Sequence, residues 1–301
     1  MCRRRARLSA SAKATADRRS AKREGWSTGS GRACVVLALA ALLLATPHAQ
    51  SDARQRSFDE VLDIYVRDGE VYYRALKIER AKLDGYVGSL ATAADNRMGR
   101  EERIAFWMNA YNALVLQTVI DHYPIAKRSN DYPAKSIRQI PGAFERLPHR
   151  VAGRSVTLDQ IEQSILLEFH DPRIFLALGR GALGSGRLRS EAFTAQRLED
   201  QLAEAALECA TRARCLSIDR EADTIAVSSV FSWREKEFAA KYADAAPPAF
   251  ASRSPIERAV IALLQPKLLT IEREVISRNT FHLAYIPFDW TLNDLTGRGE
   301  R

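Results

Sequence analysis

The feature that most constrains the fold is one long helix, predicted over residues 100–122. Its apolar residues recur at helical spacing and cover nearly all of its sides: Ile104, Phe106, Met108, Ala110, Tyr111, Ala113, Val115 and Val119. A helix that is apolar almost all round has neighbours on several sides, so we expect it at the centre of the fold. Tyr123-Pro124 ends it, because proline disfavours helical geometry in the residue before it.

Two amide side chains, Asn109 and Asn112, lie three positions apart in this helix and share a face. Buried amides need hydrogen-bond partners, so we expect the pair to hold neighbouring loops. Trp107 and Tyr111 are expected in the interior beside them. Ligand binding is the less common alternative for such a group.

The rest of the chain predicts short helices and strands in irregular order. Helices are expected at 57–66, 77–92, 195–211, 233–242 and 255–266, and from a capping box at Thr157 and Gln160 to about residue 169. A short strand or an extended turn is expected at 71–73. Strands are expected at 149–152 and 174–178, in a hairpin of 215–218 with 224–227, and at 281–285. This order argues against a doubly wound parallel sheet. It favours an α+β fold, with a small mixed or antiparallel sheet packed against a helical layer in a single domain.

The first 50 residues have the three parts of a secretory signal peptide. A basic stretch precedes an apolar run of 13 residues at 33–45, and small residues follow, with cleavage expected after Ala45 or Ala49. Thirteen residues fall short of the roughly 20 that span a bilayer, so no stable membrane span is expected after leader removal. We expect residues 51–301 to form a periplasmic or secreted domain. An inner-membrane protein anchored by an uncleaved leader is the alternative.

The positive net charge of the chain comes from this leader. The sequence holds 45 basic and 37 acidic residues, a formal net charge of +8. Ten of the basic and two of the acidic residues lie in residues 1–50, which leaves 35 of each sign in the rest. A neutral body exerts no long-range pull on phosphate backbones, so no nucleic-acid partner is expected.

Two cysteines remain after the leader, Cys209 and Cys215, six positions apart. In an oxidising compartment they are able to form a disulfide. Two buried free thiols are the alternative, and the sequence leaves both open.

Residues 179–184 spell GxGxxG, the pattern of a dinucleotide-binding loop. Such a loop lies between the strand and the helix of a βαβ unit, and here the next helix is expected only near residue 195. Ser185 lacks the GxSxG setting of a nucleophile elbow, because Leu183 stands at the first glycine position. The histidines after the leader are not spaced as zinc ligands. We therefore expect no cofactor and no metal site.

Five segments, in order along the chain, resemble motifs of the DUF547 family, which is named for its lack of a known function. They are AFWMNAYNAL at 105–114, VTLDQIE at 156–162, DPR with the apolar run after it at 171–178, SSVFSW at 228–233 and FDWTLN at 288–293. The resemblance covers about residues 57–294. It makes Asp289, Trp290, Arg189 and Glu191 structural or binding candidates, together with the residues of the long helix.

The chain departs from the family where the family motif carries cysteines. After the 171–178 segment the family has a stretch like VCGAXSCPPLRXEAF, and this chain has GRGALGSGRLRSEAF at 179–193. Arg180 and Ser185 stand at the cysteine positions, Gly186 and Arg187 at the proline positions, and Gln163 at a histidine position. The flanking residues remain, so the resemblance implies a retained scaffold with a lost thiol site.

The segment at 179–187, here called the 179–187 loop, contains four glycines and no proline. We expect it to be flexible, exposed and near Gln163. Arg180, Arg187 and Arg189 make it basic, so the ligand expected here, if there is one, is a small anion. A solvated loop that binds nothing is the alternative.

Two hypotheses on function follow. The favoured one is an exported, non-catalytic binding or scaffolding domain of unknown ligand. The alternative is an exported hydrolase or transferase in which Ser185 replaces the family's cysteine. A serine nucleophile needs a positioned base, which Gln163 is unable to provide, so His149, His170 or His282 would have to lie within reach.

The leader predicts a specific mass for the exported protein. Cleavage just after the apolar run removes about 45–50 residues, because signal peptidase cuts at the small residues that follow such a run. Intact-mass spectrometry of the exported protein checks this. A full-length, membrane-retained product would contradict it.

Overall fold

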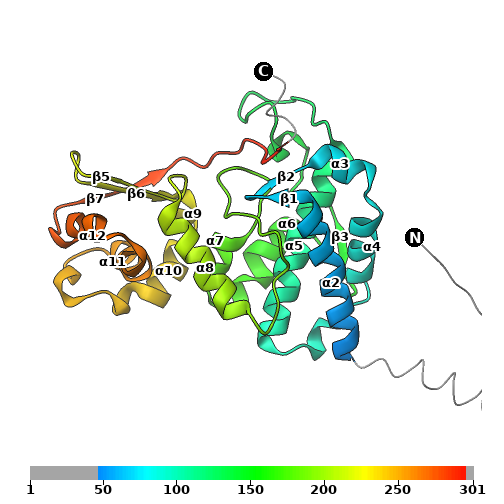
Figure 1. Ribbon diagram of the computed structural model, residues 1–301, viewed down its shortest axis with the longest axis horizontal. Helices are drawn as coiled ribbons and strands as arrows, with labels where there is room; N and C mark the ends of the chain where they lie inside the picture. The colour runs from blue at the N-terminus through cyan, green and yellow to red at the C-terminus, as the bar shows by residue number, and fades with distance from the viewer. Residues whose placement is uncertain (1–46, 296–301) are drawn as a thin grey trace, which may run out of the picture. The chain divides into compact units, whose positions relative to one another are not determined.

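Helix α5, Arg100–His122, lies at the centre of the fold, as the sequence predicts (Figure 1). The computed structural model describes residues 47–295, and the apolar run of the expected leader at 33–45 lies outside them. Every residue of α5 from Ile104 to Leu116 is buried. That stretch is longer than three helical turns, so every side of the helix meets protein.

Three helices from the N-terminal part of the described chain pack around α5. They are α2, Pro47–Tyr65, then α3, Tyr73–Ile78, and α4, Ala81–Leu90; α3 and α4 contact α5, and α2 contacts both of them. The helix expected at 77–92 is present as α4, but it begins only at Ala81, because residues 77 and 78 belong to α3. Glu79 leaves helical geometry between α3 and α4, where its carboxylate accepts a hydrogen bond from the Tyr65 hydroxyl at 2.8 Å.

The helices of the C-terminal half form a second group. Helix α8, Leu198–Thr211, packs on the short helix α7, Arg173–Ala177. Helix α9, Ser229–Trp233, leads into α10, Glu235–Tyr242, which packs on α11, Pro255–Leu264. Helix α12, Thr270–Ser277, was not expected from the sequence.

Short helical turns connect these elements. Helix α6, Leu158–Gln160, follows the predicted capping box of Thr157 and Gln160, which is confirmed, and continues as a π-helical turn at Ile161–Ile165. Turns of 3-10 helix are Asp95–Arg97, Ile137–Gln139, Leu167–Phe169, Ala243–Ala245, Pro248–Phe250 and Gln265–Lys267. Among residues 47–295, no helix is both long and apolar enough to cross a bilayer.

The strands form three small sheets within the described residues, in keeping with the expected α+β class. Strands β1, Val66–Arg67, and β2, Glu70–Val71, form one hairpin; β3, His149–Val151, and β4, Arg154–Val156, form another. Strands β5, Leu216–Asp219, and β6, Thr224–Ser228, pair antiparallel as predicted, and β7, His282–Ile286, joins β6 in parallel. The strand expected at 71–73 is shorter than predicted, because Tyr73 begins α3.

The strand expected at 174–178 is wrong, because this stretch is helix α7. The Asp171 carboxylate accepts a hydrogen bond from the Arg173 backbone N–H at 3.1 Å, which begins the helical turn. All residues from Ile174 to Leu178 are buried. In a short run that is buried on every side, apolar and polar residues do not alternate with a helical or a strand period. Its sequence therefore does not distinguish strand from helix.

The two amides of α5 fix the segment that follows α7. Asn109 exchanges two hydrogen bonds with the backbone of Phe193, at 2.8 and 2.9 Å. Asn112 accepts the Gly179 backbone N–H at 2.9 Å. Both amides are buried, as are Trp107 and Tyr111, so the expected interior position of these four residues is confirmed. The amides thus hold both ends of residues 179–193 against the central helix.

Replacing Asn112 with alanine should destabilise the fold. The buried Gly179 N–H then loses its acceptor, which costs about 1–3 kcal/mol of unfolding free energy. Urea denaturation checks this, with Asn96→Ala at an exposed position as the control. Equal unfolding free energies for the two variants would contradict it.

Candidate functional site

The 179–187 loop is packed into the protein, and the expectation that it is exposed is wrong. Residues 179–182 are buried and residues 183–187 are half-buried. The Leu183 and Gly184 backbone N–H groups donate hydrogen bonds, each 2.8 Å long, to the carbonyl oxygens of Thr291 and Asp289. The loop is therefore bonded to α5 on one side, through Asn112, and to the C-terminal segment on the other.

The loop glycines allow close packing. A Cβ atom at Gly186 would lie 1.8 Å from the Leu176 carbonyl oxygen, and one at Gly184 would lie 2.6 Å from the Asp289 backbone nitrogen. Gly181 has a φ of +67°, which residues with a side chain rarely adopt. At these positions glycine allows the backbone to pack more closely than a residue with a side chain would permit. The glycines therefore serve close packing and not the expected flexibility.

Arg180 extends from this loop into the interior and forms an ion pair with Glu162. Its Nη2 lies 2.6 Å from Glu162 Oε1, and its Nε lies 3.1 Å from Oε2. The side chains of Arg180 and Glu162 are only 2% and 8% exposed. Tyr111 donates its hydroxyl hydrogen to Glu162 Oε2 at 2.9 Å, and Arg234 Nη2 lies 3.4 Å from Oε1. We call these four residues the Arg180–Glu162 cluster.

The π-helical turn at Ile161–Ile165 places Glu162 in this cluster. Such a turn contains one more residue than an α-helical turn, which changes the faces that its side chains occupy. Glu162 is buried, whereas Gln163 beside it is exposed. The contact with Arg180 is thus made by Glu162, and the side chain of Gln163 faces solvent.

The charges of the Arg180–Glu162 cluster stabilise one another. Burial alone would raise the pKa of Glu162, but Arg180, Tyr111 and Arg234 together lower it below the ordinary value. Burial, and then the charge of Glu162, raise the pKa of Tyr111, so its hydroxyl keeps its proton and donates. Arg234 also lies over the Phe175 ring, 4.1 Å from its centroid. Two guanidinium groups and one carboxylate give the cluster one excess positive charge.

The other basic residues near the loop are also paired. Arg187 lies 2.7 Å from Glu208, and Arg189 lies 2.6 Å from Glu191. Arg189 contacts Glu204 as well. An anionic ligand would therefore find no free guanidinium group on Arg187 or Arg189, because Glu191 and carboxylates of α8 already neutralise them.

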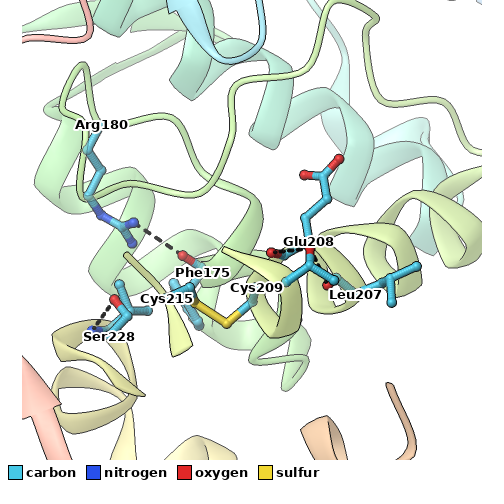
Figure 2. Close-up of a disulfide and its surroundings, with 9 residues drawn as sticks. Phe175, Arg180, Leu207, Glu208, Cys209, Cys215 and Ser228 are labelled. Carbon is cyan, nitrogen blue, oxygen red and sulfur yellow. Dashed lines mark hydrogen bonds between the residues drawn. A yellow bond between two sulfur atoms is a disulfide. The ribbon is translucent and has the colours of Figure 1, made fainter. Parts of the chain in front are cut away.

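Ser185 lies at the edge of a small cleft beside a disulfide. Its hydroxyl oxygen accepts the Arg180 backbone N–H at 3.0 Å, and no histidine is among its hydrogen-bond partners in residues 47–295. The cleft, about 20 Å³ in volume, is also lined by Cys209 and Cys215. These cysteines form a disulfide that joins the end of α8 to the start of β5. Figure 2 shows this disulfide near Phe175, whose carbonyl oxygen accepts a hydrogen bond from Arg180.

Asp289 and Trp290 have structural roles at the C-terminal segment. The Asp289 carboxylate accepts the Thr291 backbone N–H at 3.0 Å and so shapes the turn. Trp290 packs against Phe288, with ring centroids 4.4 Å apart, and Arg138 lies over its ring. Trp233, which is 45% exposed, extends this aromatic group toward Arg180.

Sequence reasoning did not single out Glu162 or Arg234 as site residues. One signal for Glu162 was present: it lies four positions after Leu158 and next to Ile161, on the apolar face of its helix. A charged residue on such a face needs a buried partner. Arg234 has no comparable signal, because it stands at a helix junction with no clear periodicity.

Residues 96–208 of the chain match the family described as "Protein of unknown function, DUF547". The chain thus carries a DUF547 domain over this range, which includes α5, the Arg180–Glu162 pair, the 179–187 loop and most of α8. No curated protein and no solved structure matches the chain significantly. In the part of the chain that the structure describes, no three His, Cys, Asp or Glu side chains are grouped to hold a metal ion.

Replacing Glu162 with glutamine should destabilise the protein in a pH-dependent way. At neutral pH two buried guanidinium groups lose their counter-charge, which costs about 3–5 kcal/mol of unfolding free energy. Because the folded protein lowers the pKa of Glu162 below its value of 4.5, the stability from this carboxylate is present above pH 4.5. It is lost as the pH falls through the folded pKa.

Thermal denaturation from pH 7 to pH 3 measures this difference. We expect the midpoints of the wild type and Glu162→Gln to differ most near neutral pH and to converge below pH 4.5. Glu221→Gln, at an exposed turn, is the control. A difference that stays constant over this range would show that the charge of Glu162 contributes nothing.

Proposed function

We propose that this protein is exported from the cytoplasm and acts as a non-catalytic binding or scaffolding domain. The observation that carries the proposal is the position of Arg180. Arg180 stands where the family motif has a cysteine, and its side chain is 2% exposed and paired with Glu162. A nucleophile must reach its substrate, and the side chain at this position is instead a buried structural cation.

Glu162 is the last residue of the VTLDQIE segment that resembles the family, directly before Gln163 at the family's histidine position. Arg180 gives this carboxylate a counter-charge inside the protein, so the pair needs no outside partner. Arg180 and Glu162 therefore support a scaffold in which the site of the family's first cysteine is filled by the chain itself.

The proline positions of the motif lead to the same proposal. A proline at 186 would place its Cβ against the Leu176 carbonyl oxygen, where 1.8 Å is available. The backbone here follows a path that the family's proline would not permit. The geometry that proline gives to a cysteine-bearing loop is thus absent from residues 179–187.

The contacts of Ser185 do not support the alternative hypothesis of a hydrolase or transferase that uses this serine. A serine hydroxyl needs a base within hydrogen-bond reach to become a nucleophile. The hydrogen bond of the Ser185 oxygen comes from the Arg180 backbone N–H. His149, His170 and His282 make no hydrogen bond with Ser185 in residues 47–295.

Export is supported by two separate features of the chain. The leader is the first, and the disulfide of Cys209 and Cys215 is the second. Disulfides persist in oxidising compartments and are rare in the cytosol. A periplasmic or secreted location agrees with both.

A test of Ser185 separates the two hypotheses. We expect Ser185→Ala to leave ligand or partner capture from periplasmic extract unchanged, because Ser185 contributes only an acceptor for the Arg180 N–H. The purified wild type, Ser185→Ala and the control Ser190→Ala are also assayed against panels of esters, amides and thioesters. If the wild type and Ser190→Ala hydrolyse a substrate that Ser185→Ala does not, the protein is a serine enzyme instead.

A further inference from the structure

A cavity of about 140 Å³ lies between α2, α4, the N-terminal half of α5 and residues 193–196. None of its lining residues belongs to the Arg180–Glu162 cluster. Its floor is buried and mainly apolar, and its rim is polar and partly exposed. The floor includes Tyr86, Phe106 and Phe193, and the rim includes Arg54, Glu102 and Gln196. An engineered apolar cavity of about 150 Å³ holds benzene, so this space suits a side chain of four to six carbons.

Arg54 brings to this cavity a guanidinium group that forms no ion pair within residues 47–295. Its Nε is buried and has no hydrogen-bond partner in residues 47–295. Its guanidinium carbon lies 5.9 Å from the centroid of the Phe106 ring. The Arg54 side chain as a whole is half-buried, whereas the fully buried Arg180 has a carboxylate at 2.6 Å. A buried donor without a partner is costly, and an anion bound in the cavity would remove that cost.

Tyr86 adds a second free donor to the floor. Its ring stacks on Phe58 with centroids 4.5 Å apart, and only 3% of the residue is exposed. Within the described chain its hydroxyl makes no hydrogen bond with protein. Burial raises the pKa of Tyr86, so the hydroxyl keeps its proton and is able to donate it. Arg54 and Tyr86 together offer donors to a carboxylate.

Glu102 provides the opposite charge at the rim. It lies in the first turn of α5 and is half-buried, and no cation pairs with it among residues 47–295. A carboxylate here attracts an ammonium group and repels a second negative charge on a ligand. The cavity therefore combines a free cation, a free anion and an apolar floor.

We propose that this cavity binds a small α-amino acid with an apolar side chain. Arg54 and Tyr86 receive the carboxylate, Glu102 receives the ammonium group, and Phe106 and Phe193 contact the side chain. The proposal rests on the binding function proposed above and names the ligand class of that function.

Calorimetric titration of the purified protein with three related probes tests the proposal. Leucine carries both charges, 4-methylpentanoate lacks the ammonium group, and isopentylamine lacks the carboxylate. We expect leucine to bind with the highest affinity. The affinity for 4-methylpentanoate should be about fivefold lower, since an exposed charge contact is worth about 1 kcal/mol. Isopentylamine should bind weakest, because the buried donors are then left without an acceptor.

Three variants assign the roles. Arg54→Gln should lower leucine affinity by about tenfold or more, and Tyr86→Phe by about fivefold, while Tyr86→Phe keeps the stack on Phe58. Glu102→Gln should lower the affinity for leucine but leave the affinity for 4-methylpentanoate unchanged. The control Arg220→Gln makes the same charge change at an exposed turn and should alter neither affinity. Thermal denaturation verifies that each variant is folded.

Two results would overturn the amino-acid site: no binding of any probe by the wild type, or equal leucine affinity for the wild type and Arg54→Gln. Neither result bears on Ser185. Conversely, hydrolysis that depends on Ser185 would overturn the non-catalytic function and leave the calorimetric result as measured. The failures of the two proposals are therefore distinguishable.

Discussion

Arg180 places a full positive charge where water is almost excluded, and much of the surrounding structure supplies what that charge needs. Glu162 provides the counter-charge, and the π-helical turn brings Glu162 inward. The Phe175 carbonyl oxygen accepts a further hydrogen bond, and Ser185 accepts the Arg180 backbone N–H. A buried charge is stable only when it is paired and its donors are satisfied, so these contacts are required together.

Helix α5 connects this cluster to the cavity through residues that lie one turn apart. Tyr111 donates to Glu162, and Asn112 accepts Gly179 at the start of the loop. Asn109 lines the cavity and holds Phe193, which forms part of its floor. Both sites therefore depend on the same polar residues of one buried helix. A ligand in the cavity contacts the segment whose other end contains Arg180.

The sequence predicts the local features well and the long-range ones poorly. Helix α5, the Thr157 capping box and the β5–β6 hairpin are set by periodicity, capping chemistry and turn residues close in sequence. The loop at 179–187 was expected to be exposed because glycines permit flexibility. Its burial is instead decided by contacts with Leu176 and Asp289. The cavity has no sequence signature, because Arg54, Tyr86 and Glu102 come from three different helices.

The residues of the 179–187 loop and Glu162 form one connected set of contacts. Arg180 would be an unpaired buried charge without Glu162. Gly186 allows the Leu176 carbonyl oxygen to approach the loop, because a Cβ atom there would lie 1.8 Å from that oxygen. Arg187 pairs with Glu208 of α8. A loop without a structural role would have exposed, unpaired residues, whereas each of these residues has a partner. Residues 179–187 are thus a built structural element, as the proposed scaffold requires.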